Sequence, residues 1–215
     1  MAGIRRLIDN CVAVGAKSLL LGGIGQEKLV EAYYKVIAET CDYAAEKGLP
    51  ITVKPHGGLN ATGPQCRKCV EMAGHKNFSL WYDPGNIYFY SDGQRNPVED
   101  AATVDGLVTV GLCIKDFDRP VMDGKPTRTV AITPGTGMVD FRKVLAVLKR
   151  GGFTSGYLVI ECLADAATGT GHQRRFARQL VGHTALSRRS AIRIATRAKL
   201  KISAASTATA APNRT

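Results

Sequence analysis

Ionisable or thiol side chains stand at the ends of four short apolar runs in this 215-residue chain, where each run gives way to a turn. A carboxylate beside a cation suits proton transfer next to a carbonyl, because one group takes the proton and the other stabilises the charged oxygen. Four such ends together predict a convergent functional site rather than unrelated turn residues. The residues at these points are Lys54, Asp83, Cys113 and Glu161.

Four more polar residues lie beside these ends and are candidates for binding substrate hydroxyls: His56, Asn86, Lys115 and Asp116. Each also has a purely structural interpretation. His56 could simply bond the glycine loop that follows it, Asn86 could be a turn residue, and Lys115 with Asp116 could be a surface ion pair. The sequence leaves both interpretations open for each residue.

The apolar runs alternate strictly with segments of helical period, which indicates an α/β fold with a parallel sheet and right-handed crossovers. Gly and Pro punctuate the pattern, and the longest helix stops at Gly48. We expect parallel strands, adjacent in this order, at 17–22, 51–55, 78–83, 107–115 and 157–161. We expect helices at 4–14, 26–47, 64–73, 97–104, 140–150 and 171–181, with loops at 84–96 and from 116 to about 137.

Four motifs in this order resemble the xylose isomerase-like TIM barrels, over roughly residues 15–182. They are Asp-Pro-Gly-Asn at 83–86, Ile-Lys-Asp at 114–116, Pro-Gly-Thr-Gly-Met-Val-Asp at 134–140, and Val-Ile-Glu at 159–161. That group contains sugar and sugar-phosphate isomerases and epimerases, and also the endonuclease IV type of DNA-repair enzyme. The resemblance implies a carbohydrate as the small-molecule partner.

The resemblance also implies a metal site. In the family, four strand ends supply Glu, Asp, His and Glu to a divalent ion, and these positions fall on Lys54, Asp83, Cys113 and Glu161. Asp83 and Glu161 would then be metal ligands. Lys54 and Cys113 depart from the pattern, and an ammonium opposes a cation. A divalent metal (Mn, Mg, Co or Zn) and no metal at all therefore both stay open, with Glu161 as the catalytic base and Lys54 or a metal on Asp83 as the electrophile.

The length of the chain predicts an incomplete barrel. A closed eightfold barrel needs about 250 residues, whereas this chain offers five βα units, which align with the last five of eight. We expect a partial TIM-type barrel over 1–183, either as a fragment of a longer product or as a chain that self-associates or pairs with another polypeptide through its open sheet edges.

The remaining residues, 184–215, read as a basic, largely disordered tail. From residue 165 onward there are ten Lys or Arg and one acidic residue, which accounts for most of the net charge of +11. The tail is rich in Ser, Ala, Thr and Arg and has little large apolar surface to offset its ordering entropy. A solvated extension is favoured over a nucleic-acid-binding segment.

Composition argues against a membrane protein, a secreted protein and a cysteine-based metal or redox site. No apolar run approaches the roughly 20 residues that span a bilayer, and the N-terminus makes a poor signal peptide, so the cytoplasm is the expected location. The single CxxC, Cys66 to Cys69, predicts a reduced pair on one helix face rather than a metal or redox site.

Three functions follow from these patterns. The first is a sugar or sugar-phosphate isomerase or epimerase that abstracts a proton next to a carbonyl at the C-terminal rim of the barrel. The second is a metal-free, non-catalytic sugar-binding relative or inactive fragment. The third, an endonuclease IV-like enzyme, is disfavoured because only one histidine, His56, lies at a strand end.

Overall fold

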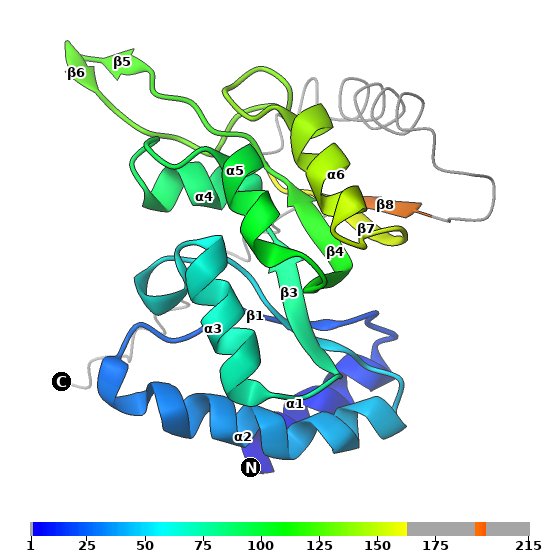
Figure 1. The fold of residues 1–215 in the computed structure, drawn as a ribbon. Helices are drawn as coiled ribbons and strands as arrows, with labels where there is room; N and C mark the ends of the chain where they lie inside the picture. Colours follow the sequence, from blue (N-terminus) through cyan, green and yellow to red (C-terminus); the bar gives the residue numbers. More distant parts are fainter. Residues whose placement is uncertain (1, 163–191, 197–215) are drawn as a thin grey trace, which may run out of the picture.

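The computed structural model describes residues 2–162 and, as backbone only, residues 192–196. Its centre is a curled parallel sheet, a half-barrel of five strands in the order expected from the sequence (Figure 1). The partial TIM-type barrel is therefore confirmed. The strands are β1 (Leu19–Leu21), β2 (Ile51–Val53), β3 (Phe78–Tyr82), β4 (Val108–Ile114) and β7 (Gly156–Ile160).

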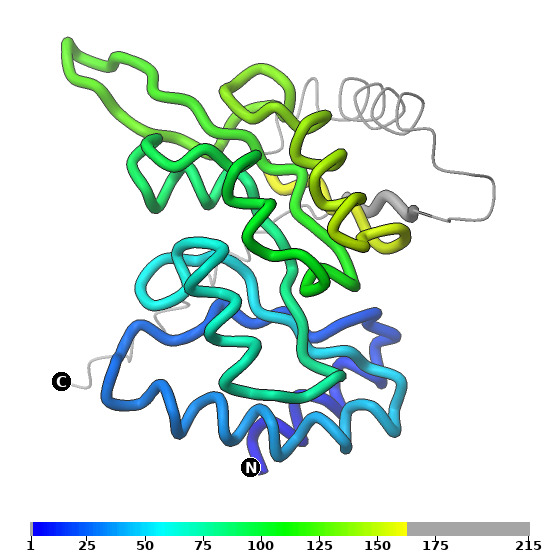
Figure 2. The backbone as a smooth tube through the Cα atoms, in the orientation of Figure 1, coloured from blue at the N-terminus to red at the C-terminus, as the bar shows by residue number. Residues whose placement is uncertain are grey.

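Helices connect the strands and cover the sheet, and Figure 2 follows the chain from the blue N-terminal helix through the sheet to residue 162. The expected helices are present within the described residues, with ends shifted by at most three residues. They are α1 (Ala2–Ala13), α2 (Glu27–Glu46), α3 (Gly63–Ala73), α5 (Pro97–Ala101) and α6 (Phe141–Arg150), with short 3₁₀ turns η1 (Gly58–Asn60) and η2 (Ala102–Val104).

The sequence specifies the ends and inner faces of these helices. The buried residues of α2 recur every three or four positions, which places them on one face. Helix α3 begins with a capping box, in which the Gln65 N–H donates to the Thr62 hydroxyl and the Thr62 N–H donates to the Gln65 side-chain oxygen. It ends at Gly74, whose φ of 60° is the left-handed conformation that glycine tolerates best. These local signals fix the helices that space the strands.

Two segments expected to be loops contain regular structure. Residues Pro84–Tyr90 form a helix, α4, because Asp83 caps it: its Oδ1 accepts the Asn86 N–H at 3.0 Å, and Pro84 suits the first turn. The segment after β4 contains a small antiparallel hairpin of β5 (Val121–Met122) and β6 (Lys125–Pro126), which projects from the molecule in Figure 1.

Part of the C-terminal segment that was expected to be largely disordered contains a strand. Residues Ile192–Thr196 form a sixth strand, β8, parallel to β7. The open edge of β7 offers unpaired backbone groups, and three of the five residues of β8 are β-branched, which favours a strand there. The helix expected at 171–181 and the rest of the 184–215 tail lie outside the described residues.

The CxxC pair lies on the inner face of α3. Cys66 and Cys69 are buried free thiols that donate to the backbone carbonyls of Asn60 and Leu59. Burial raises the pKa of the Cys66 thiol, so that the thiolate needed for redox chemistry is disfavoured. No disulfide joins the two thiols in this structure, and their role stays a prediction.

Among the helices of the described residues, none is both long and apolar enough to cross a membrane.

Candidate functional site

Four charged side chains meet at the carboxyl ends of β2, β3, β4 and β7, and we call them the rim cluster: Lys54, Asp83, Lys115 and Glu161. Parallel strands bring their C-terminal ends to one edge, which is why residues so far apart in sequence converge. The Lys54 Nζ lies 3.2 Å from Asp83 Oδ2 and 2.9 Å from Glu161 Oε2. The Lys115 Nζ lies 3.1 Å from Asp83 Oδ2 and 2.9 Å from Glu161 Oε1. Each ammonium therefore contacts both carboxylates.

This arrangement shifts the pKa values of Lys54 and Glu161. Burial alone raises the pKa of Glu161, but the charges and hydrogen bonds of Lys54 and Lys115 outweigh it and lower that pKa to about 2. Burial lowers the pKa of Lys54, and the neighbouring charges, chiefly Asp83 and Glu161, reverse that effect and raise it overall. At neutral pH Lys54 is therefore an ammonium and Glu161 a carboxylate, and the two lie side by side.

Cys113 completes the convergence that the sequence predicted. The ligand-type atoms of Asp83, Cys113 and Glu161 lie within 4.8 Å of one another, and the Lys54 Nζ is 4.0 Å from Cys113 Sγ. Burial, followed by the charge of Asp83, raises the pKa of the Cys113 thiol well above its ordinary value, so the thiol is protonated.

The side chains as arranged do not fit a divalent cation. Two ammonium groups already lie against the carboxylate oxygens that would bind it. The remaining donor, Cys113, offers sulfur, whereas hard ions such as Mg²⁺ prefer oxygen ligands.

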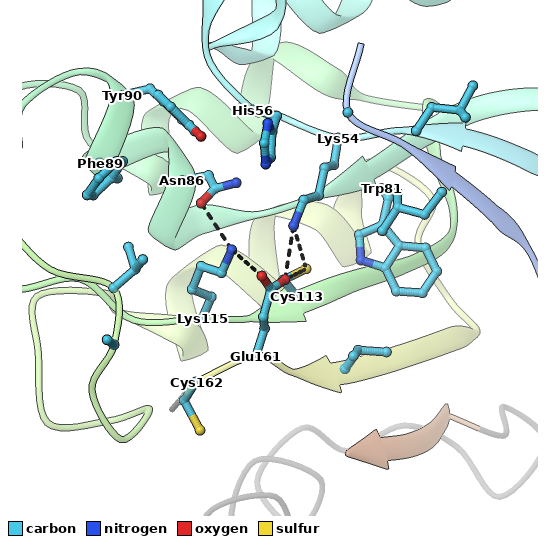
Figure 3. A pocket seen from close by; sticks show the side chains of 16 residues that line it. Lys54, His56, Trp81, Asn86, Phe89, Tyr90, Cys113, Lys115, Glu161 and Cys162 are labelled. Atoms are coloured by element: carbon cyan, nitrogen blue, oxygen red, sulfur yellow. Dashed lines mark hydrogen bonds and ion pairs between the residues drawn. The ribbon is translucent and has the colours of Figure 1, made fainter. Parts of the chain in front are cut away.

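Asn86 and His56 lie beside the rim cluster, in the places predicted for substrate contacts (Figure 3). The Asn86 Oδ1 accepts from Lys115 Nζ at 3.1 Å, and its Nδ2 donates to the Pro55 carbonyl at 2.7 Å. The His56 ring packs against Tyr90. Burial, helped by the charges of Lys54 and Lys115, lowers the pKa of His56, which is therefore neutral at pH 7.

Asp116 has a different environment from its predicted neighbours at the site. Its carboxylate is fully buried and accepts backbone N–H groups at 2.8–3.0 Å from Phe117, Gly135, Gly137 and Val139. It is not among the residues that line the cavity. Asp116 thus anchors the loop before α6, while Lys115 turns inward to the rim cluster and is not part of a surface ion pair.

The rim cluster opens into a cavity of about 800 Å³, a size that suits a small-molecule ligand. Three aromatic residues of its wall were not predicted: Trp81, Phe89 and Tyr90. Trp81 could have been found, because it stands two residues before Asp83 on one strand and so faces the same side of the sheet. Phe89 and Tyr90 were missed because their helix, α4, was read as a loop.

The curled parallel sheet with an ionisable cluster on its C-terminal rim defines the chain as a barrel-type α/β protein with its site in the usual place for that class. The chain belongs to the xylose isomerase-like TIM barrel family, whose model matches residues 1–180.

Two curated relatives are inosose dehydratases. The chain is 25% identical over 134 residues to that of Geobacillus thermodenitrificans, and 23% identical over 172 residues to that of Glaesserella parasuis. These matches cover 59% and 73% of this chain but only 44% and 55% of the relatives. The chain thus spans about half the length of the curated relatives it matches.

Solved structures show the same fold. A xylose isomerase domain protein from Planctomyces limnophilus superposes with a TM-score of 0.66 at 21% identity, covering 84% of this chain and 64% of that one. D-allulose 3-epimerase from Methylomonas sp. in complex with D-allulose gives 0.64 at 17% identity, with 81% and 66% covered. A Mycobacterium smegmatis protein of the family, in complex with magnesium, gives 0.66 at 18% identity, with 84% and 66% covered.

Proposed function

We propose that this chain binds a carbohydrate that carries a carbonyl group and moves a proton at the adjacent carbon without a metal ion. The observation that carries the proposal is the position of the Lys54 ammonium, 3.2 Å from Asp83 and 2.9 Å from Glu161, between the carboxylates that the family pattern assigns to a metal. A fixed cation at this point supplies the positive charge that proton abstraction next to a carbonyl requires.

Glu161 is the base in this scheme. Its side chain lines the cavity and is 29% exposed, so that a ligand can reach it, whereas Asp83 is fully buried behind it. Glu161 takes the proton as the C–H bond breaks, and the electron pair of that bond forms a C=C bond while the carbonyl oxygen becomes an enolate. Lys54 and Lys115 stabilise the enolate oxygen, and Asn86 and His56 contact hydroxyl groups.

The fate of the enolate decides the product class. Return of the proton on the other face gives an epimer, return at the neighbouring position of an enediolate gives an isomer, and loss of a hydroxyl group as water gives a dehydrated product. The relatives named as inosose dehydratases and D-allulose 3-epimerase support a ligand of the ketosugar or keto-polyol class.

A second candidate is sugar binding without catalysis. One observation favours it: both oxygens of Glu161 are paired with ammonium groups, which lower its pKa to about 2 and make it a weak base. The two candidates share the cavity and the ligand, and differ in whether the proton moves.

Hydrogen exchange in D2O separates the candidates, because it detects proton abstraction whatever product follows. The protein is incubated with D-allulose, D-fructose or an inosose in buffered D2O containing EDTA, and deuterium at the carbon next to the carbonyl is followed by NMR. We expect exchange above the level of the Glu161→Gln control. Binding without exchange supports the second candidate, and exchange that appears only after Mn²⁺ is added contradicts the metal-free mechanism.

A further inference from the structure

One buried polar atom in the cavity wall is left without a partner. The Trp81 indole Nε1 forms no hydrogen bond with any of the described residues, although Trp81 is only 5% exposed. Leaving a buried donor unsatisfied costs about 1–3 kcal/mol, so such groups in folded proteins usually have a partner. Trp81 lines the same cavity as the rim cluster, which makes a bound ligand the natural partner.

The orientation of the ring agrees with this role. Trp81 lies on β3 two residues before Asp83, so both side chains leave the strand on the same face. In Figure 3 the indole nitrogen is on the edge of the ring turned toward the side of the cavity where Lys54 and Cys113 lie.

The indole ring also packs against a glycine on the neighbouring strand. Gly111 on β4 faces its benzene edge, and a Cβ at Gly111 would lie 2.7 Å from Trp81 Cη2, closer than any side chain tolerates. The glycine therefore gives the ring the space it occupies.

We infer that Trp81 is a ligand-binding residue whose indole N–H donates a hydrogen bond to a hydroxyl or carbonyl oxygen of the carbohydrate. This inference rests on the proposed function, because it assigns the ligand of the same cavity. The indole is a donor only, so its partner must be an acceptor oxygen. Its N–H is also without a partner among the described residues, whereas the Nζ atoms of Lys54 and Lys115 already contact carboxylates. A ligand that lacks an oxygen at this point loses the contact, which makes Trp81 a determinant of specificity.

The composition of the chain makes the test direct, because Trp81 is its single tryptophan. A ¹H–¹⁵N spectrum of the full chain contains one indole resonance, which needs no assignment by mutation. D-allulose, D-fructose and an inosose are titrated while calorimetry records the dissociation constant of each. We expect the indole resonance to move downfield and to saturate at the calorimetric dissociation constant of the sugar that binds.

A pair of variants sharpens the result. Trp81→Phe keeps an aromatic ring but removes the N–H, and we expect it to weaken binding roughly 3- to 10-fold. Tyr34→Phe removes a polar hydrogen from another buried ring, on α2 and outside the cavity lining, and should leave the dissociation constant unchanged. If Trp81→Phe does not fold, the resonance of the unmodified chain decides alone.

The outcomes distinguish the inference from the function on which it rests. Sugar binding with an unmoved indole resonance, or with full affinity in Trp81→Phe, overturns the role of Trp81 and leaves the proposed function standing. If none of the three sugars binds, the proposed function fails and this inference fails with it.

Discussion

Asp83 and Asp116 are both fully buried carboxylates just past the ends of neighbouring strands, but their partners differ in kind. Asp83 is held mainly by side-chain cations, Lys54 and Lys115, which themselves line a cavity. Asp116 is held by backbone N–H groups of the loop at 135–139 and of Phe117. A buried acid satisfied by backbone donors fixes the fold, whereas Asp83 is satisfied mainly by two lysines that line the cavity.

Asp100 supports the same distinction. Both of its oxygens accept the Gly63 N–H at 3.0 Å, and it also bonds Tyr82 at 3.1 Å and Arg95. It ties the start of α3 to α5 and is not among the residues that line the cavity. A buried acidic residue is thus not diagnostic by itself, and its bonding partners decide its role.

The largest expected effect is on stability, at Asp116. Asp116→Ala leaves four backbone N–H groups without their acceptor, and we expect it to lower the free energy of unfolding by about 3 kcal/mol or more. Urea denaturation measures this change. The control Asp42→Ala, at a side chain that is 85% exposed, should change stability by about 0.5 kcal/mol or less. A small effect at Asp116 would remove the distinction between the two carboxylates.

The second effect is on activity, at Glu161. Glu161→Gln keeps the size of the side chain but removes the base, so we expect hydrogen exchange of the bound sugar to fall about 100-fold or more. Exchange per folded molecule is compared with that of Asp116→Asn, which should retain it, because Asp116 does not line the cavity. Loss of exchange in Asp116→Asn together with retained exchange in Glu161→Gln would contradict the roles assigned to these two carboxylates.

The third effect is the pH dependence of stability. The pKa of Glu161 falls from 4.5 to about 2 in the folded chain, so its ion pairs stabilise the fold above about pH 4.5 and are lost as pH falls through 2. Urea unfolding between pH 7 and pH 2 should therefore show a decline in acid that is shallower in Glu161→Gln. Equal declines in both proteins would mean that the folded-state pKa of Glu161 is not lowered.

The smallest effect belongs to the projecting hairpin. Met122 is 60% exposed at its tip, so Met122→Ser should change the free energy of unfolding by no more than about 0.5 kcal/mol. The affinity for sugar should also stay the same, because Met122 does not line the cavity. Urea denaturation and calorimetry check both values, and a clear loss of affinity would extend the site to the hairpin.

Much of the fold could be read from the sequence because apolar runs, helical period and glycine stops are local signals. The convergence of Lys54, Asp83, Cys113 and Glu161 also followed, since parallel strands end at one edge. Helix α4 was missed because the Asp-Pro pair at 83–84, read as a turn, is also a helix start.

The partners of Asp116 and Lys115 could not be predicted, because they depend on contacts between distant segments. The Gly135 N–H comes from 19 residues away, and the Glu161 partner of Lys115 comes from β7. The β8 strand likewise needed the open edge of β7, which composition alone does not reveal. The local sequence pattern was enough to predict where the site lies. The bonding partners of its residues became known only from the tertiary structure.

A manganese titration tests the central claim, that lysine takes the place of the family's metal, most directly. Calorimetry compares the unmodified chain with Lys54→Glu, which exchanges an ammonium for a third carboxylate, and with Lys54→Met, which removes the charge and adds no ligand. We predict a dissociation constant weaker than about 1 mM for the unmodified chain, at least about 10-fold tighter binding in Lys54→Glu, and little gain in Lys54→Met. Tight, stoichiometric binding to the unmodified chain would contradict the account.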